Sequence, residues 1–185
     1  EWDNIVGRPD ISSFEDLFSD EKEEKVEQVV SLPKSFVSLA NKNLPLAARI
    51  PLGYLKKRGI EESDILRWKI GYCPSGKYSD RIVIPSFGLA GRPNYFVARS
   101  YNGDWKRYMN PPASRDVVFN ELYLDFDEDL VIVEGAFDAI VAGPNAVPIL
   151  GSNLNENSSL FQKIVKNDTP IYIALDPDAE KKALK

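Results

Sequence analysis

The sequence predicts an α/β fold in two lobes, a basic lobe of mixed α+β structure followed by a lobe built on a parallel, Rossmann-like sheet. Two apolar runs indicate the parallel sheet: LVIV at 130–133 and IYIAL at 171–175 each lead directly into acidic residues and a helical segment. Runs without polar alternation are typical of strands that are buried on both faces. Charge separates the lobes, because residues 31–120 carry a basic excess and residues 121–185 an acidic one.

The composition excludes several kinds of chemistry. Of the 185 residues, 43% are hydrophobic and 28% are charged, as in an ordinary globular protein. The single cysteine, Cys73, cannot form an internal disulfide, and the absence of histidine rules out Ser-His and Cys-His pairs and Cys/His zinc sites. Catalysis would therefore depend on carboxylates, Lys, Arg or a hard metal ion bound by oxygen. Without a membrane-spanning run or a signal peptide, we expect a cytoplasmic protein with no membrane partner.

Charge falls into three blocks along the chain. Residues 1–30 carry a net charge of −7, residues 31–120 carry +9, and residues 121–185 carry −7. A charge run is most often a solvated face, but the basic block is where a polyanion would bind. The predicted organisation is an acidic linker or N-terminal extension at 1–33, a basic α+β lobe at 34–124 and a parallel-sheet lobe at 125–185. Because the sequence opens on Glu1 and closes within a helical pattern, we expect a fragment whose last lobe is truncated.

The basic lobe is predicted to contain two helices and a β-hairpin. AARIPLGYLKKR (47–58) has a helical pattern after Pro51 that stops at Gly59, and EESDILRWK (61–69) has acids in its first turn, where they suit the helix dipole. RIVIPSF (81–87) and NYFVARSY (94–101) are typical of strands, and the GLAGRP between them is typical of a turn.

A basic segment follows the hairpin. In NGDWKRYMNPP (102–112), Lys106, Arg107, Tyr108 and Asn110 precede two prolines, which prevent a helix and stiffen the chain. One interpretation is a rigid edge that contacts phosphate, with Tyr108 or Trp105 stacking on a base. The alternative is a surface loop with long side chains lying along it. Composition does not decide between them.

Acidic residues follow both buried strands. Glu134 and Asp138 follow the first strand and lie one helical turn apart, while Asp176 and Asp178 follow the second. Functional sites in open α/β sheets lie beyond the carboxyl ends of the strands, so parallel neighbouring strands would bring all four acids to one edge. Either pair alone is more often a helix cap. Both pairs together predict a site for Mg²⁺ or Mn²⁺, which prefer oxygen ligands.

VIVEGAFDAI and IALDPDAEKKA resemble the two halves of a Toprim domain, the metal-binding module shared by DnaG-type primases, type IA and type II topoisomerases, OLD-family nucleases and RecR-like proteins. YLKKRGI, ILRWKIGYCP, RIVIPSF, YFVARS and KRYMNPP resemble, in order, the segments that precede Toprim in primases of phage and bacterial type. The likeness covers roughly residues 47–185. Two features depart from the family: its DGD-like motif is DPD here, and its zinc module is absent.

The resemblance assigns roles to particular residues. It implies that Glu134, Asp176 and Asp178 bind the metal, with Asp138 as an accessory acid. It also implies a face toward nucleotide and template, made of Arg81, Arg99, Lys106, Arg107 and Asn110. It leaves open whether Lys106 or Arg107 takes the role of the family's lysine. The implied partners are a single-stranded DNA template, ribonucleoside triphosphates and a replicative helicase, in the cytoplasm of a bacterium or a phage-infected host.

The function that follows is metal-dependent synthesis of short RNA primers on single-stranded DNA by the catalytic core of a DNA primase. Two divalent ions on the carboxylates would activate the primer 3′-hydroxyl and neutralise the incoming triphosphate. Two alternatives remain at this stage. One is a Toprim enzyme that cuts DNA, a topoisomerase or nuclease. The other is a module that binds single-stranded nucleic acid without catalysis.

Overall fold

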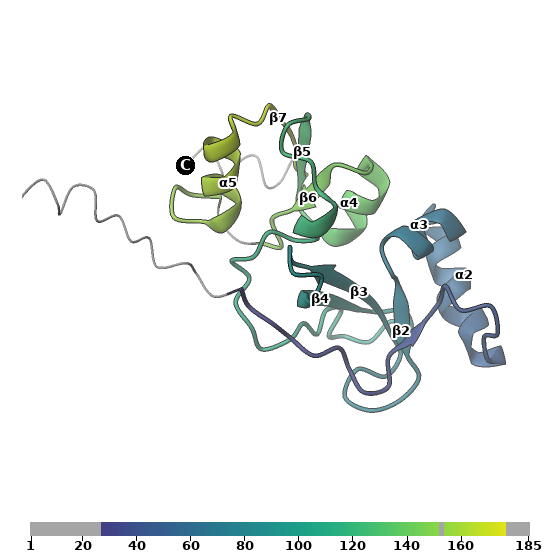
Figure 1. The fold of residues 1–185 in the computed structure, drawn as a ribbon. Coiled ribbons are helices and arrows are strands. Elements are labelled where there is room, and N and C mark those ends of the chain that lie inside the picture. The colour runs from purple at the N-terminus through teal and green to yellow at the C-terminus, as the bar shows by residue number, and fades with distance from the viewer. Residues whose placement is uncertain (1–26, 152–153, 177–185) are drawn as a thin grey trace, which may run out of the picture.

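The structure, a computed structural model, describes residues 27–151 and 154–176 (Figure 1). It contains two sheets, an antiparallel one with strand order β1-β2-β3-β4 and a parallel one with order β6-β5-β7. The helices α2 and α3 lie beside the antiparallel sheet, and α4 lies between them and the parallel sheet (Figure 1). The predicted fold class, a mixed α+β lobe followed by a parallel-sheet α/β lobe, is confirmed.

The basic lobe contains both predicted helices and the predicted hairpin. Its strands are β1 (Val37–Ser38), β2 (Gly71–Cys73), β3 (Arg81–Phe87) and β4 (Pro93–Ser100), and its helical elements are η1 (Leu46–Ala48), α2 (Arg49–Lys57), α3 (Glu62–Arg67) and η2 (Glu121–Tyr123). The helix expected after Pro51 begins at Arg49 instead, because proline is tolerated in the first turn, where the N–H has no intrahelical partner. The helix ends before Gly59 as predicted. This glycine has a φ of 75°, and the N–H of Ile60 reaches back to the Leu55 carbonyl at 3.1 Å in a Schellman motif.

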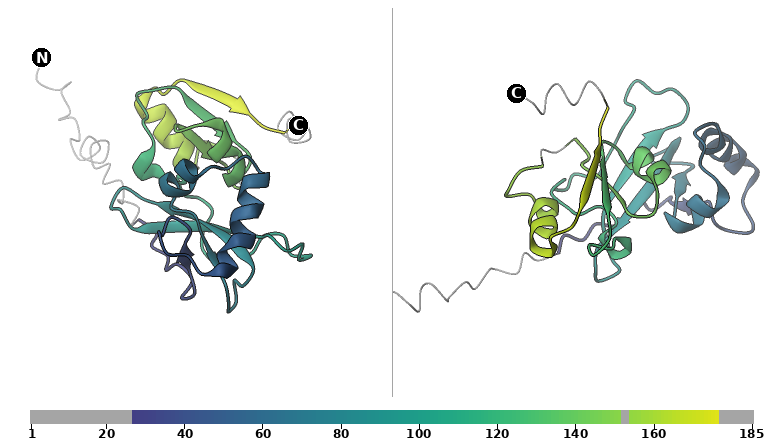
Figure 2. Two further views of the ribbon diagram at one scale, coloured as in Figure 1. Left: turned by 90° about the vertical axis from the view of Figure 1, so that its right-hand side faces the viewer. Right: turned by 90° about the horizontal axis from the view of Figure 1, so that it is seen from above.

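The second lobe is a parallel sheet with a helix on each side. Its elements are β5 (Leu130–Val133), α4 (Ala136–Ala142), β6 (Ala146–Pro148), α5 (Ser159–Asn167) and β7 (Ile171–Ala174). The strand β5 is central, as its apolar run predicted, and it pairs in parallel with both neighbours. Seen from above, α4 and α5 lie on opposite sides of this sheet (Figure 2). Neither β6 nor α5 was predicted from the sequence.

One prediction for this lobe is wrong: β7 is not buried. Tyr172 is 61% exposed and Ile173 63% exposed, although the run IYIAL was expected to lie in the interior. The reason is its position, because β5 is the one strand of the described chain that pairs with β7. An apolar run shows that a strand can be buried, but the neighbours in the sheet decide whether it is.

The two lobes share one hydrophobic core. A single cluster of buried side chains extends from Leu55 and Trp68 in the basic lobe to Ile132 and Ala139 in the parallel lobe. A smaller cluster, which includes Cys73, lies on the other face of the antiparallel sheet. The expected boundary near residue 124 falls in the loop between η2 and β5 and stays a prediction. Among the described helices, none is long and apolar enough to cross a membrane.

Candidate active site

The register of the parallel sheet brings two of the predicted acids to the same edge. Val133 lies opposite Ala174, so Glu134 is level with Leu175, and Asp176 is one residue further along. Both carboxylates are exposed. This edge is formed by the carboxyl ends of the strands, where open α/β sheets bind their ligands. The prediction that the two apolar strands are parallel neighbours is confirmed.

Asp138 has a structural role in addition to any part in the site. Its Oδ2 accepts a hydrogen bond of 3.0 Å from the N–H of Gly135, the residue before α4. The start of α3 is built in the same way, because Asp64 Oδ2 accepts from the N–H of Glu61 at 2.9 Å. Such contacts satisfy backbone donors at helix N-termini that have no partner within the helix. The cap interpretation therefore accounts for Asp138, while Glu134 makes no such contact with any residue that the structure describes.

The side-chain oxygens at this edge are of the type that binds a hard cation. Glu134 and Asp176 offer carboxylate oxygens, the ligand type of Mg²⁺ and Mn²⁺. Within 27–151 and 154–176, no group of three or more acidic or thiol side chains is close enough to hold a metal ion. The fourth predicted acid, Asp178, lies outside the described residues.

Helix α4 joins the carboxylate edge to the basic lobe through Phe137, three residues after Glu134. The Phe137 ring packs edge-on against Tyr54 of α2, with ring centroids 6.4 Å apart. Two guanidinium groups also lie near it, Arg58 at 5.0 Å and Arg99 at 5.7 Å from the ring centroid. Cations and carboxylates therefore occupy the same end of the junction between the lobes.

Arg99 is held in place by tyrosines. Its Nε donates to the Tyr54 hydroxyl at 2.8 Å, and its Nη1 donates to the Tyr108 hydroxyl. Burial lowers the pKa of Arg99, but the hydrogen bonds and charge interactions with Tyr108 and Tyr54 raise it by more, so the net shift is upward. The Arg99 guanidinium is partly buried, and the partners that fix its position among the described residues are hydroxyl groups.

The basic segment after the hairpin is attached to β4 along its outer edge. The N–H of Ser100 donates to the Arg107 carbonyl at 2.9 Å, and the N–H of Met109 donates to Ala98 at 2.9 Å. Asn110 Oδ1 accepts from the N–H of Ala98 at 3.3 Å, so its carbonyl oxygen is already in use. This extended, sheet-bound backbone favours the rigid edge over the loose loop.

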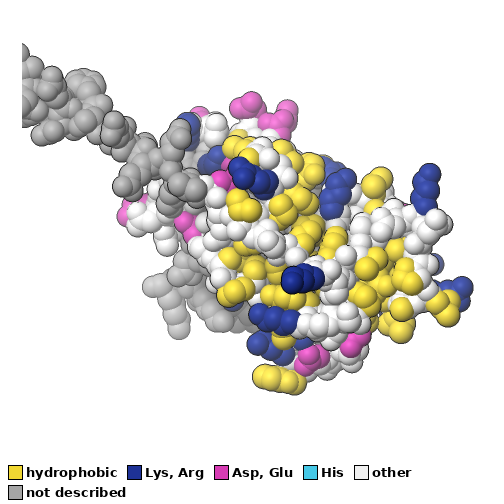
Figure 3. Space-filling view, turned by 60° about the horizontal axis from the view of Figure 1, so that its bottom comes forward, with side chains coloured by type: hydrophobic (Ala, Val, Ile, Leu, Met, Phe, Trp, Pro, Cys, Tyr) yellow, Lys and Arg dark blue, Asp and Glu magenta, His cyan; other side chains and the backbone are white. Residues whose placement is uncertain are grey.

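Side chains on this segment remain available to a ligand. Lys106 and Arg107 are exposed, and so is Tyr108 at 42%. Basic side chains stand among apolar ones over much of the face in Figure 3, with acidic side chains mainly toward its margins. A polyanion could therefore approach without meeting a carboxylate at most points.

Arg81 lies beneath this segment. Its side chain is 3% exposed, its Nη2 pairs with Asp104 Oδ2, and its Nη1 donates to the Lys106 carbonyl at 2.8 Å. The resemblance assigned Arg81 to the face toward nucleotide and template. In the structure its guanidinium is occupied by Asp104 and the Lys106 carbonyl, so it holds the basic segment in place from beneath.

The chain is similar to bacterial DNA primases, although no family model matches it. It is 26% identical to the DNA primase of Thermotoga maritima over 171 residues, covering 68% of this chain and 30% of that primase. It is also 26% identical to the DNA primase of Synechococcus elongatus over 159 residues, covering 79% of this chain and 22% of that primase. The chain thus spans less than a third of the length of each of these two relatives.

Solved primase structures have the same fold. The RNA polymerase domain of Mycobacterium tuberculosis primase DnaG superposes with a TM-score of 0.66 at 19% identity, covering 79% of this chain and 65% of that one. A DnaG primase catalytic domain bound to single-stranded DNA superposes with a TM-score of 0.63 at 18% identity, covering 76% of this chain and 58% of that one. The chain is a distant homologue of bacterial DNA primases. Its fold is that of their catalytic core.

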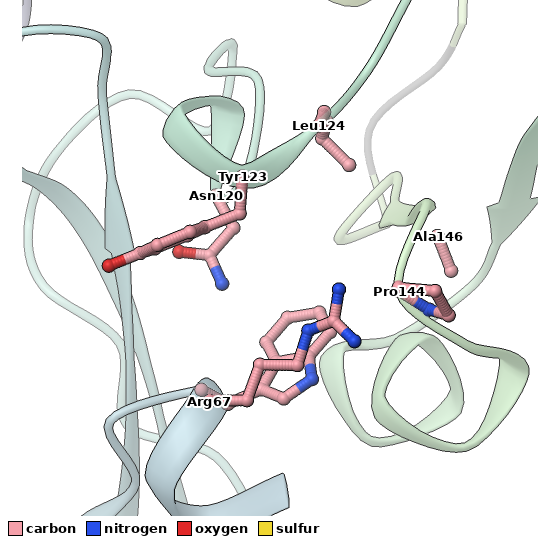
Figure 4. Close-up of a pocket in the computed structure, with 7 residues that line it drawn as sticks. Arg67, Asn120, Tyr123, Leu124, Pro144 and Ala146 are labelled. Atoms are coloured by element: carbon pink, nitrogen blue, oxygen red, sulfur yellow. The ribbon is translucent and has the colours of Figure 1, made fainter. Parts of the chain in front are cut away.

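A narrow pocket lies at the other end of the junction in this primase fold (Figure 4). Arg67 extends from the end of α3 toward Pro144 and Ala146, and Asn120 and Tyr123 line the opposite wall. Pro144 and Ala146 lie where β6 begins, which is the amino edge of the parallel sheet. Ligands bind at the carboxyl edge in such sheets, so this pocket is a seam between the lobes and a poor candidate for a ligand site.

Arg58 was not predicted as a site residue. It lies over the Tyr54 ring at 4.9 Å as well as over Phe137, and it is exposed at the same end of the junction as Glu134 and Arg99. The segment YLKKRGI contains it among three consecutive basic residues. Sequence alone does not show which of these three residues lies toward the parallel-sheet lobe.

Proposed function

We propose that the chain is the catalytic core of a DNA primase that synthesises short RNA primers on single-stranded DNA from ribonucleoside triphosphates. One observation carries this proposal: in a primase fold, the register of β5 and β7 places Glu134 and Asp176 on one edge, at the end of the junction where Arg99 lies. A DnaG primase catalytic domain of the same fold is bound to single-stranded DNA, which supports the same template here.

In this proposal Glu134, Asp176 and Asp178 hold Mg²⁺ or Mn²⁺. When bound, these ions neutralise charge on the triphosphate and activate the attacking 3′-hydroxyl. The chain's own residues bind and orient the substrates. Because Arg99 is fixed by two tyrosine hydroxyls, its charge is already positioned for a phosphate before substrate arrives. No covalent enzyme intermediate is needed, since the reaction depends on placement and charge stabilisation.

The remaining predicted residues take supporting or peripheral roles. Lys106 and Arg107 contact phosphates of the template or the nucleotide, and Asn110 contributes its amide N–H₂ group, because its carbonyl oxygen is bound to β4. Asp138 fixes the turn that follows Glu134. We also propose a replicative helicase as a further partner. The proposed location is the cytoplasm of a bacterium or phage-infected host.

The first test is stabilisation by the metal. An ion at ten times its Kd would stabilise the folded state by about 1.4 kcal/mol, which is about 3 to 6 °C in Tm for a chain of this size. Asp176→Asn and Glu134→Gln each remove one ligand charge at nearly constant shape and should abolish this shift. Glu128→Gln, which changes an exposed acid in the loop before β5, is the matched control and should leave the shift intact.

The second test is activity in the full-length protein. Asp176→Asn and Glu134→Gln should abolish primer synthesis on a single-stranded template without unfolding the protein. If both variants make primers at the wild-type rate, the assignment is wrong. Cutting of the template would instead identify a Toprim nuclease or topoisomerase, and binding without either reaction would identify a non-catalytic module.

A further inference from the structure

Trp105 is held almost entirely in solvent. It is 91% exposed, whereas Trp68 is 4% exposed and packs against Phe119 in the core. Large aromatic side chains contribute most when they are buried, so an indole this exposed gives the folded chain little stability. A scattered surface leucine would need no explanation. An exposed tryptophan within a basic segment is better explained by contact with a ligand.

The exposure of Trp105 does not come from a loosely held loop. The residues on both sides of it are fixed by Arg81: Asp104 pairs with its Nη2, and the Lys106 carbonyl accepts from its Nη1 at 2.8 Å. Asp104 also accepts from the Lys106 N–H at 3.0 Å, and its own N–H donates to Ser100 Oγ at 3.2 Å. The backbone therefore presents the indole in a defined position, which lowers the entropic cost of binding to it.

The surroundings of Trp105 are positively charged. The next two residues, Lys106 and Arg107, are both exposed cations. The nearest acid in the sequence, Asp104, is paired with the buried Arg81, so its charge is compensated. Further along the same segment, Tyr108 lies under the Arg99 guanidinium at 4.9 Å. An aromatic face beside cations is the combination that single-stranded nucleic acid requires.

We propose that Trp105 is a stacking platform for one base of a single-stranded nucleic acid, while Lys106 and Arg107 contact the adjacent phosphates. This inference rests on the proposed function, since the strand would be the primase template, and it adds a base contact to the phosphate contacts. Every base has a π-face, so the contact tolerates any sequence. A surface that holds an unspecified template must have this property.

The test measures binding of a fluorescent oligo(dT) strand by anisotropy over a range of salt concentrations. Trp105→Ala should weaken binding by about five-fold to about a hundred-fold, the range for loss of one stacked base. Because no charge is removed, the slope of log affinity against log salt should not change. Lys106→Ala should instead reduce that slope by about 0.7, the value for one phosphate contact to a single strand.

Two further variants serve as controls. Trp105→Phe keeps an aromatic face and should recover most of the affinity. Leu89→Ala removes an exposed apolar side chain, 62% exposed, from the turn at the opposite end of the same hairpin and should bind as the wild type does. Circular dichroism melting confirms that each variant folds, which is expected because Trp105 is not part of the core.

Three outcomes would overturn the inference. Wild-type affinity in Trp105→Ala would show that the indole does not contact the strand and is free for a protein partner. A changed salt slope in that variant would show that it acts through the neighbouring charges. If the wild type fails to bind oligo(dT) at all, the proposed template function fails, together with this contact. If the wild type binds and Trp105→Ala binds equally well, the primase proposal is unaffected and only the stacking role of Trp105 is wrong.

Discussion

Replacing Asp104 by Ala should lower the free energy of unfolding and loosen the basic segment. Arg81 is a buried cation with a 3% exposed side chain, and its described partners are the Asp104 carboxylate and the Lys106 carbonyl. Its Nε has no hydrogen-bond partner in the described chain. Removing the carboxylate therefore leaves the buried charge of Arg81 with one neutral acceptor. Deleting one partner of a buried ion pair in this way destabilises a protein more than replacing both partners.

The size of the effect follows from the exposure of the two partners. Breaking a buried pair by deleting one member costs about 3 to 5 kcal/mol. Asp104 is 35% exposed, so water screens part of the interaction and we expect about 2 kcal/mol from the charge. Loss of the hydrogen bond that Asp104 accepts from the Lys106 N–H adds about 1 kcal/mol. A total of about 3 kcal/mol corresponds to a fall in Tm of about 6 to 12 °C.

The assay is urea unfolding followed by circular dichroism, with Glu128→Ala as the control at an exposed acid, expected to change stability by less than about 0.5 kcal/mol. The double variant Arg81→Met with Asp104→Ala distinguishes the cause. Since it removes the unpaired charge, it should be more stable than Asp104→Ala alone. A loss below about 1 kcal/mol in Asp104→Ala, or a double variant less stable than the single one, would refute the buried-charge explanation.

Three further outcomes are expected. Burial, followed by the neighbouring Asp80, raises the pKa of Tyr101 from 10.0 to about 12. The stabilisation of the fold by its neutral phenol should therefore be complete below pH 10 and be lost toward pH 12. Tyrosinate absorbance measures the pKa, and Tyr101→Phe should not lose stability over this pH range. Burial raises the pKa of the Cys73 thiol, so a thiol reagent at pH 8 should label it only after unfolding, and rapid labelling of folded protein would contradict its place in the core. Phe137→Ala should cost about 3 to 5 kcal/mol because the ring joins the two lobes, and denaturant unfolding that shows a loss under about 1 kcal/mol would mean the junction repacks without it.

Local patterns predicted the elements that depend on local chemistry. The hairpin of β3 and β4 follows from two strand patterns around a glycine-containing turn, and the end of α2 follows from Gly59. The central position of β5 follows from an apolar run with a buried environment on both faces. In the first two cases the residues that form the element also determine its boundaries, so no distant partner was needed. The central position of β5 also requires β6 and β7 on either side of it.

The features that were missed depend on distant partners. Arg81 was expected on the surface, but its partner Asp104 lies 23 residues away and the bond between them forms only in the folded hairpin. The exposure of β7 depends on which strands flank it in the sheet. Asp138 is a local case, because Gly135 is only three residues away: the sequence allowed a helix cap or an accessory acid of the metal site, and the hydrogen bond to Gly135 shows that the cap is made. The location of Glu134 and Asp176 at one edge of the sheet was predicted correctly, because both follow parallel neighbouring strands.

The pairing of the basic segment with β4 limits how the sequence can change in length. Arg99 and Tyr108 lie opposite each other in an antiparallel bridge, so consecutive side chains from Arg107 to Met109 alternate between the two faces of the sheet. Deleting or inserting one residue within the paired stretch, between Arg107 and Met109, would shift this alternation and turn Tyr108 away from Arg99. Related sequences should therefore vary in the identity of these side chains far more freely than in the number of residues that connect them.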